Sequence, residues 1–170
     1  MQENTVALQA LRQAMRLEQD GYKFYTEAAE RTADPRGREM FLSLADDEKL
    51  HLRIVWDQYE ALKGGKGWVS FSEALEFKPV DVDKPLFPPE REALEKAVSP
   101  KASDTDALLF GLQIENESYE LYRKAASETA DPAGKDMYQR LASYERTHFD
   151  LLMLNYEHLV STGNWRSLQD

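Results

Sequence analysis

The chain has 170 residues, and 21 lysines and arginines stand against 31 aspartates and glutamates, for a net charge of −10 at pH 7. This length suits one domain with a buried core. The acidic balance argues against a general nucleic-acid or anionic-membrane binder, which would need a positively charged surface. Cysteine is absent, which excludes disulfides, thiol catalysis, zinc fingers and iron–sulfur or rubredoxin-type centres.

The hydropathy pattern predicts no association with a membrane. No window approaches the roughly 18 uninterrupted apolar residues of a spanning helix. The first five residues, MQENT, contain no basic stretch followed by an apolar one and show no export signal. We therefore expect a cytoplasmic protein.

An internal repeat organises the chain. Residues 10–62 match residues 107–159 at a constant offset of 97 without a gap, and about 20 of the 53 pairs are identical. The chain is thus a duplicated unit within one expected domain, 1–170. We predict a helical hairpin over about 5–62, a crossover over about 63–103 and a second hairpin over about 104–162.

Each copy has the apolar periodicity of two helices. Seam residues recur in steps of three or four, and an Asp-Pro pair begins the second helix of each copy, at Asp34-Pro35 and Asp131-Pro132. Ser103 and Asp106 form a capping pair before the third long helix. The crossover is rich in glycine and proline, with short helices expected over 72–77 and 90–98. These features predict an all-α, four-helix bundle.

Six polar residues occupy seam positions where the periodicity predicts apolar side chains. They lie near the middle of their helices, so an antiparallel bundle brings them to one depth. Residues three apart, as in each Glu-x-x-His pair, share a helix face. The six are Glu18, Glu48, His51, Glu115, Glu145 and His148.

Four ionised carboxylates in a core repel each other and lose their hydration. No lysine or arginine falls on the seams to pair with them. Two divalent cations would balance the four charges, and two imidazoles would complete the ligand set of a di-iron carboxylate bundle. Mixed oxygen and nitrogen ligands suit two iron ions, with manganese or zinc also possible.

These residues resemble the ferritin-like superfamily and, within it, rubrerythrin-like proteins. The resemblance implies that all six are metal ligands, with Glu48 and Glu145 as bridging carboxylates. It also implies that Tyr25 and Tyr122 hydrogen-bond the ligand carboxylates. Two family glutamates are replaced here, by Ser118 and Thr147, which leaves the leaner set of four glutamates and two histidines.

The resemblance implies an oxidoreductase of the peroxidase or ferroxidase type, which reduces hydrogen peroxide or dioxygen with electrons from ferrous iron. Without cysteine the chain has no electron-entry centre of the rubredoxin type, so an external electron-donor protein is expected. A homodimer is expected as well. The alternatives are iron sequestration or delivery without turnover, and a metal-free bundle that acts as an interaction module.

Several other residues have simpler interpretations. Asp47 points about 100° away from its neighbour Glu48 on an ideal helix, which predicts a surface position. Trp56, Trp68 and Trp165 either mark a subunit contact or cover the ends of the bundle. Three methionines on the seams, Met15, Met40 and Met137, are expected in the core.

Overall fold

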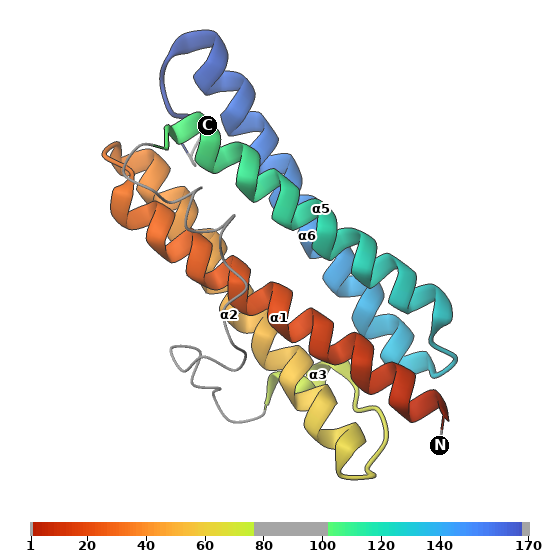
Figure 1. The fold of residues 1–170 in the computed structure, drawn as a ribbon. Helices are drawn as coiled ribbons and strands as arrows, with labels where there is room; N and C mark the ends of the chain where they lie inside the picture. Colours follow the sequence, from red (N-terminus) through yellow and green to blue (C-terminus); the bar gives the residue numbers. More distant parts are fainter. Residues whose placement is uncertain (1, 77–101, 168–170) are drawn as a thin grey trace.

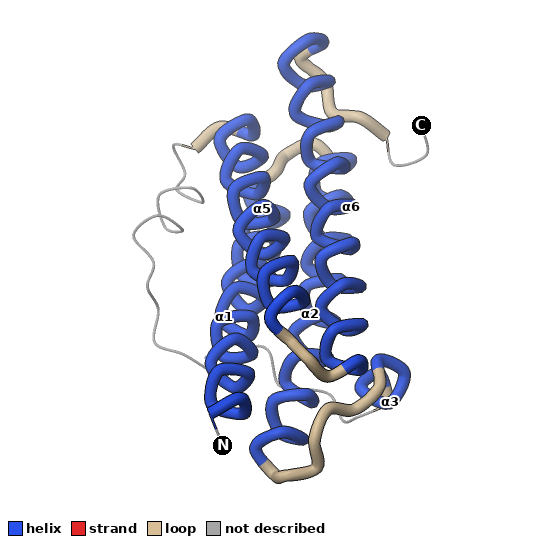
Figure 2. Tube along the Cα trace, turned by 90° about the vertical axis from the view of Figure 1, so that its right-hand side faces the viewer, coloured by secondary structure: helices blue, strands red, loops and turns tan. Residues whose placement is uncertain are grey.

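The computed structural model describes residues 2–76 and 102–167, and these ranges contain helices and no strand (Figures 1 and 2). Four long helices make up the bundle, and one short helix follows the second of them. They are α1 (Gln2–Arg31), α2 (Pro35–Lys63), α3 (Phe71–Leu75), α5 (Asp104–Glu128) and α6 (Pro132–Thr162).

The long helices form two antiparallel hairpins that lie side by side. α1 packs along α2, α5 packs along α6, and α1 contacts α5 across the bundle. In Figure 1, α1 and α6 run in one direction while α2 and α5 run in the other. The predicted all-α bundle of two helical hairpins is confirmed.

The predicted helix starts are also present. Asp34 accepts a hydrogen bond from the amide of Arg36, and Asp131 accepts from the amides of Ala133 and Gly134. Ser103 and Asp106 form a reciprocal capping box at the start of α5. These bonds satisfy amide groups that have no partner inside their helices.

Two element boundaries differ from the sequence prediction. α1 begins at Gln2 rather than near residue 5, and the short helix covers Phe71–Leu75 rather than 72–77. A second capping box, between Ser70 and Glu73, sets the start of this short helix. The helix expected over 90–98 lies outside the described residues.

Two tryptophans, 97 residues apart like the repeat itself, cover opposite ends of the bundle. A Cβ atom added at Gly134 would lie 2.7 Å from the Trp68 ring, and one added at Gly37 would lie 2.5 Å from the Trp165 ring. Gly37 and Gly134 are also equivalent in the repeat. Each copy thus places a tryptophan against the glycine in the first turn of the other copy's second helix.

We expect Gly37→Ala to destabilise the fold by about 1–3 kcal/mol, the usual effect of overpacking a core. The added methyl group would also lie 2.7 Å from the Thr32 Cγ2 atom, and both Thr32 and Trp165 are buried. Urea unfolding measures the change. Since Gly→Ala inside an exposed helix stabilises by about 1 kcal/mol, a more stable variant would contradict the packing described.

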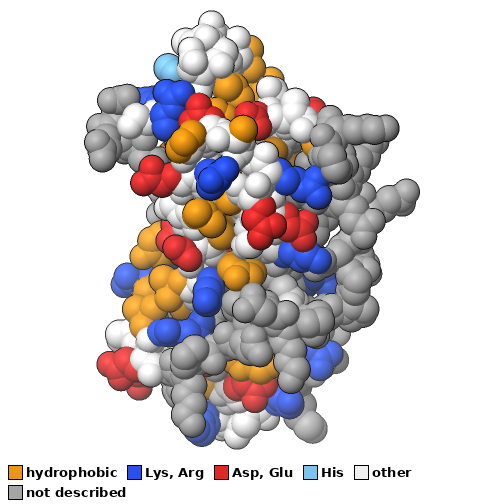
Figure 3. Space-filling view, turned by 90° about the vertical axis from the view of Figure 1, so that its left-hand side faces the viewer, with side chains coloured by type: hydrophobic (Ala, Val, Ile, Leu, Met, Phe, Trp, Pro, Cys, Tyr) orange, Lys and Arg blue, Asp and Glu red, His pale blue; other side chains and the backbone are white. Residues whose placement is uncertain are grey.

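The surface drawn in Figure 3 carries acidic and basic side chains in alternation, with apolar side chains between them. Among the described side chains visible on this face, the two signs of charge are interspersed. Among the described helices, none is long and apolar enough to span a lipid bilayer.

Candidate metal centre

The fold brings all six predicted polar residues together inside the bundle. α1 supplies Glu18 and α5 supplies Glu115, while α2 and α6 each supply a Glu-x-x-His pair. None of the six residues is more than 4% exposed. The two copies of the repeat therefore contribute equal halves of one buried cluster.

The cluster consists of two overlapping groups, each with three carboxylates and one imidazole. The first group holds Glu18 and His51, the second holds Glu115 and His148, and both include Glu48 and Glu145. Within each group, one potential ligand atom from every residue lies within 4.8 Å of the others. Glu48 and Glu145 are thus shared, which is the arrangement expected of carboxylates between two cations.

Both histidines turn the same ring nitrogen towards the glutamates. His51 Nδ1 lies 3.1 Å from a Glu145 oxygen and 3.6 Å from oxygens of Glu18 and Glu48. His148 Nδ1 lies 3.3–3.5 Å from oxygens of Glu48, Glu115 and Glu145. The two rings stack with their centroids 5.5 Å apart. The imidazoles therefore occupy neighbouring, equivalent places around the carboxylates.

The electrostatics of the cluster do not allow four free carboxylates. Burial and the nearby carboxylates raise the pKa of Glu48 and of Glu145 well above the usual range. Burial alone also raises the pKa of Glu18, but hydrogen bonding with Glu48 and the charge of His51 outweigh it and lower this pKa to about 2. Without a metal, burial and mutual repulsion therefore favour the protonated form of the two shared glutamates.

Hydrogen bonds within the described structure do not satisfy all buried polar atoms of the cluster. Among its buried atoms, four carboxylate oxygens and one ring nitrogen have no hydrogen-bond partner within the described structure; they are Glu18 Oε2, Glu48 Oε1, Glu115 Oε2, Glu145 Oε2 and His148 Nδ1. Buried polar atoms of this kind normally have a partner. In the described salt bridges, the four glutamates find cationic partners only in the two histidines. This oxygen-rich set with two nitrogens fits a pair of divalent cations such as iron or manganese.

The two predicted tyrosines contact the cluster from opposite sides. Tyr25 on α1 donates a hydrogen bond to Glu115 on α5, and Tyr122 on α5 donates one to Glu18 on α1. Both rings are buried, and burial followed by the adjacent glutamates raises the pKa of each phenol well above its usual value. Each phenol therefore remains a hydrogen-bond donor that orients a carboxylate of the other copy.

Asp47 lies at the surface as predicted, but it makes a contact with the cluster that the sequence analysis did not predict. Its side chain is 53% exposed, yet Asp47 Oδ2 accepts a hydrogen bond from His148 Nε2 over 3.0 Å. This bond is the main cause of the lowered pKa of Asp47. A carboxylate that holds the outer nitrogen of a histidine fixes which nitrogen faces the metal. The only hint in the sequence was that Asp47 directly precedes the Glu-x-x-His pair of α2. The sequence does not show which side of α2 the His148 ring approaches.

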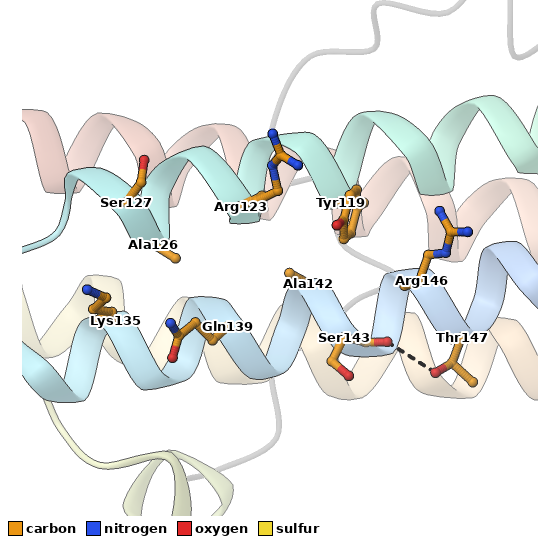
Figure 4. Close-up of a pocket in the computed structure, with 10 residues that line it drawn as sticks. All are labelled: Tyr119, Arg123, Ala126, Ser127, Lys135, Gln139, Ala142, Ser143, Arg146 and Thr147. Carbon is orange, nitrogen blue, oxygen red and sulfur yellow. Dashed lines mark hydrogen bonds between the residues drawn. The ribbon is translucent and has the colours of Figure 1, made fainter.

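A groove of about 610 Å³ runs along the outside of α5 and α6 (Figure 4). None of the six cluster residues lines it, although Thr147 at one end precedes His148. Three of its lining side chains are basic, and the lining as a whole comprises Tyr119, Arg123, Ala126, Ser127, Lys135, Gln139, Ala142, Ser143, Arg146 and Thr147. It is an outer feature of the second hairpin, not an opening into the cluster.

The fold and the buried site together define a four-helix protein with a buried carboxylate–histidine cluster that could hold metal ions. Comparison with family profiles gives the same result, since the rubrerythrin profile matches residues 9–156. The chain belongs to the rubrerythrin family. No curated protein and no solved structure matches it in the corresponding searches.

Proposed function

We propose that the protein is a di-iron oxidoreductase of the peroxidase or ferroxidase type. The observation that carries this proposal is the pair of overlapping groups that share Glu48 and Glu145 and leave buried carboxylate oxygens without hydrogen-bond partners in the described structure. A metal-free scaffold role gives no reason for two equivalent imidazoles and two shared carboxylates at one buried point. The family supports the class of metal site, and the reaction is our inference.

The roles of the protein residues follow from their positions. Glu18 and His51 would hold one ion, Glu115 and His148 the other, and Glu48 and Glu145 both. Tyr25 and Tyr122 orient the two outer carboxylates through their hydrogen bonds, and Asp47 orients His148. Burial of all six residues keeps bulk water from the cluster, which strengthens each electrostatic contact within it.

A bound ferrous pair supplies two electrons, which is the number that hydrogen peroxide needs, with two protons, to become two water molecules. The chain's part is to keep two cations close together in a neutral cage and to place proton-bearing groups beside them. Together, the Nδ1 atoms of His51 and His148 lie within 3.6 Å of oxygens from all four glutamates. Because both imidazoles would bind the ions through Nδ1, protons displaced from the shared glutamates on metal binding would leave the cluster.

The proposal is tested by anaerobic loading of the metal-free protein with ferrous iron, followed by rapid mixing with hydrogen peroxide or with dioxygen. We expect two irons per chain, and oxidation of both by one peroxide molecule, faster than by dioxygen. Glu115→Gln should lose this reaction, whereas the exposed Glu117→Gln, two residues away, should retain it. The proposal would be contradicted if neither hydrogen peroxide nor dioxygen oxidised the bound iron. It would also be contradicted if iron oxidation were equally fast in Glu115→Gln and Glu117→Gln.

The same experiment distinguishes catalytic turnover from the alternative function, iron sequestration. Uptake of many irons per chain in a large closed assembly would favour storage over turnover. We also propose, from the family resemblance, a homodimer and an external electron-donor protein. Sedimentation of the metal-loaded protein and reduction of the oxidised protein by candidate donors test these two expectations.

A further inference from the structure

A row of three aromatic rings connects the buried cluster to the end of the bundle. Tyr122, which donates to Glu18, lies next to Tyr138 with ring centroids 6.1 Å apart. Tyr138 in turn meets Trp68 edge-on at 5.7 Å. Both separations are those of rings in contact. The row therefore runs without a break from a cluster carboxylate to the loop that follows α2.

The outer end of this row is at the surface. Trp68 is half-buried, and with Tyr138 it lines a cavity of about 600 Å³ between the start of α1 and the turn from α5 to α6. Val6, which is 57% exposed, also lines this cavity. Small molecules in solution can therefore reach the tryptophan, whereas Tyr122 is closed off from them.

The repeat provides an internal comparison, because the equivalent row exists in the other half. Trp165 meets Phe41 at 5.7 Å, Phe41 meets Tyr25 at 6.1 Å, and Tyr25 donates to Glu115. The centroid distances are the same, but the middle ring is phenylalanine. Tyr25 is also flanked by Phe24 at 5.2 Å, and Trp165 is only 2% exposed. This row is closed to solvent and interrupted by rings that are hard to oxidise.

The hydroxyl group of Tyr138 is not needed for packing. Its Oη atom is buried and has no hydrogen-bond partner in the described structure, an arrangement that lowers stability. Phe41 fills the equivalent place without a hydroxyl group. What the hydroxyl adds is an electron-rich ring, since its oxygen lone pair raises the energy of the highest filled orbital. A phenol between Tyr122 and Trp68 therefore passes electrons far better than a phenyl ring.

We propose that Trp68, Tyr138 and Tyr122 form a one-electron path between the carboxylate cluster and the surface. The use we assign to it rests on the proposed function. If peroxide reached a centre with one ferrous ion, its reduction to two water molecules would take one electron from that ion, one further electron, and two protons from the solvent. Tyr122 supplies the further electron and passes its phenolic proton to Glu18. Trp68 then returns an electron to Tyr122 through the Tyr138 ring, Tyr122 regains its proton, and a one-electron reductant in solution such as ascorbate restores Trp68.

The path itself can be tested in the metal-free protein, where no iron chemistry contributes. In a Trp56→Phe background, which removes the other half-buried tryptophan, azide radicals generated by pulse radiolysis oxidise Trp68. We expect decay of the tryptophan radical to match growth of a tyrosyl radical. This growth should be lost in Tyr138→Phe and in Trp68→Phe. Equal growth in the background protein and in Tyr138→Phe would overturn the proposal.

The second half supplies the matched control. Phe41→Tyr should leave the transfer from Trp68 to Tyr122 unchanged, and in the iron-loaded protein treated with peroxide it should add oxidation products at Trp165. Mass spectrometry should locate damage at Trp68 in the unmodified protein and at Tyr122 in Tyr138→Phe. Circular dichroism checks that the variants fold. Radical transfer in the metal-free protein without peroxide reactivity after loading would reject the proposed function and leave the path intact.

Discussion

Glu48→Gln is expected to raise the stability of the metal-free protein and to remove its stabilisation by metal. Glu48 is buried among three other carboxylates, and burial and their charges raise its pKa, so the folded chain favours its protonated form. Holding a carboxyl of ordinary pKa protonated at pH 7 costs up to about 4 kcal/mol. An amide avoids this cost, so we expect a gain of about 1–4 kcal/mol, or roughly 2–4 °C in Tm for each kcal/mol.

The pH dependence identifies the cause of this gain. A carboxyl with a raised pKa contributes stability below its unfolded value, and that contribution is lost as pH rises through the folded value. The advantage of Gln should therefore vanish near pH 4 and grow towards pH 7 in thermal unfolding of the chelator-treated protein. With manganese at about 100 times its Kd, the unmodified chain should gain roughly 2.7 kcal/mol, and Glu48→Gln far less.

The exposed Glu117→Gln serves as the reference, and neither pH nor metal should alter its small effect. A Glu48→Gln protein less stable than the unmodified chain at pH 7, without metal, would show that the buried carboxyl is well satisfied. In that case the cluster would need no cation. The outcome thus bears directly on the electrostatic reason for a metal centre.

Sequence periodicity predicts the bundle and the convergence of the six residues because both depend on helix geometry alone. Glu48 and His51 share a face for any α-helix, and the offset of 97 repeats that face in α6. The contact between Asp47 and His148 depends instead on how two helices from different copies pack. A helical wheel places Asp47 at the surface correctly, but it contains no information on the neighbouring helix.

The contacts within the two rows of aromatic rings could not be predicted from the sequence for the same reason. The offset of 97 pairs Trp68 with Trp165 beyond the gapless match, and it pairs Tyr138 with Phe41, so the equivalence is visible in the sequence. Which rings touch is not visible, since the contacts run between helices and loops of different copies. The two halves share a backbone plan and differ at a few side chains. Those differences are where the halves can acquire separate roles.

Asp47→Ala is expected to weaken metal binding at one position of the pair and to spare the other. The residue equivalent to Asp47 in the repeat is Tyr144, whose ring lies 5.4 Å from that of His51 and offers His51 no carboxylate. Within the described residues, the outer ring nitrogen of His148 is therefore the one held by a carboxylate, and we expect His148 alone to respond to the loss of Asp47. Loss of such a partner typically lowers metal affinity about 10–100-fold, and we expect the lower end because Asp47 is half exposed.

Anaerobic calorimetric titration with manganese measures this effect as two binding steps. In the unmodified protein the two affinities should be of similar size, and in Asp47→Ala one step should weaken by about tenfold while the other is retained. Asp46→Ala removes the neighbouring exposed acid and should leave both steps unchanged, which controls for the loss of one negative charge. Equal weakening of both steps in Asp47→Ala would mean that Asp47 acts through the general field of the protein. The hydrogen bond to His148 would then not set the affinity of its ion.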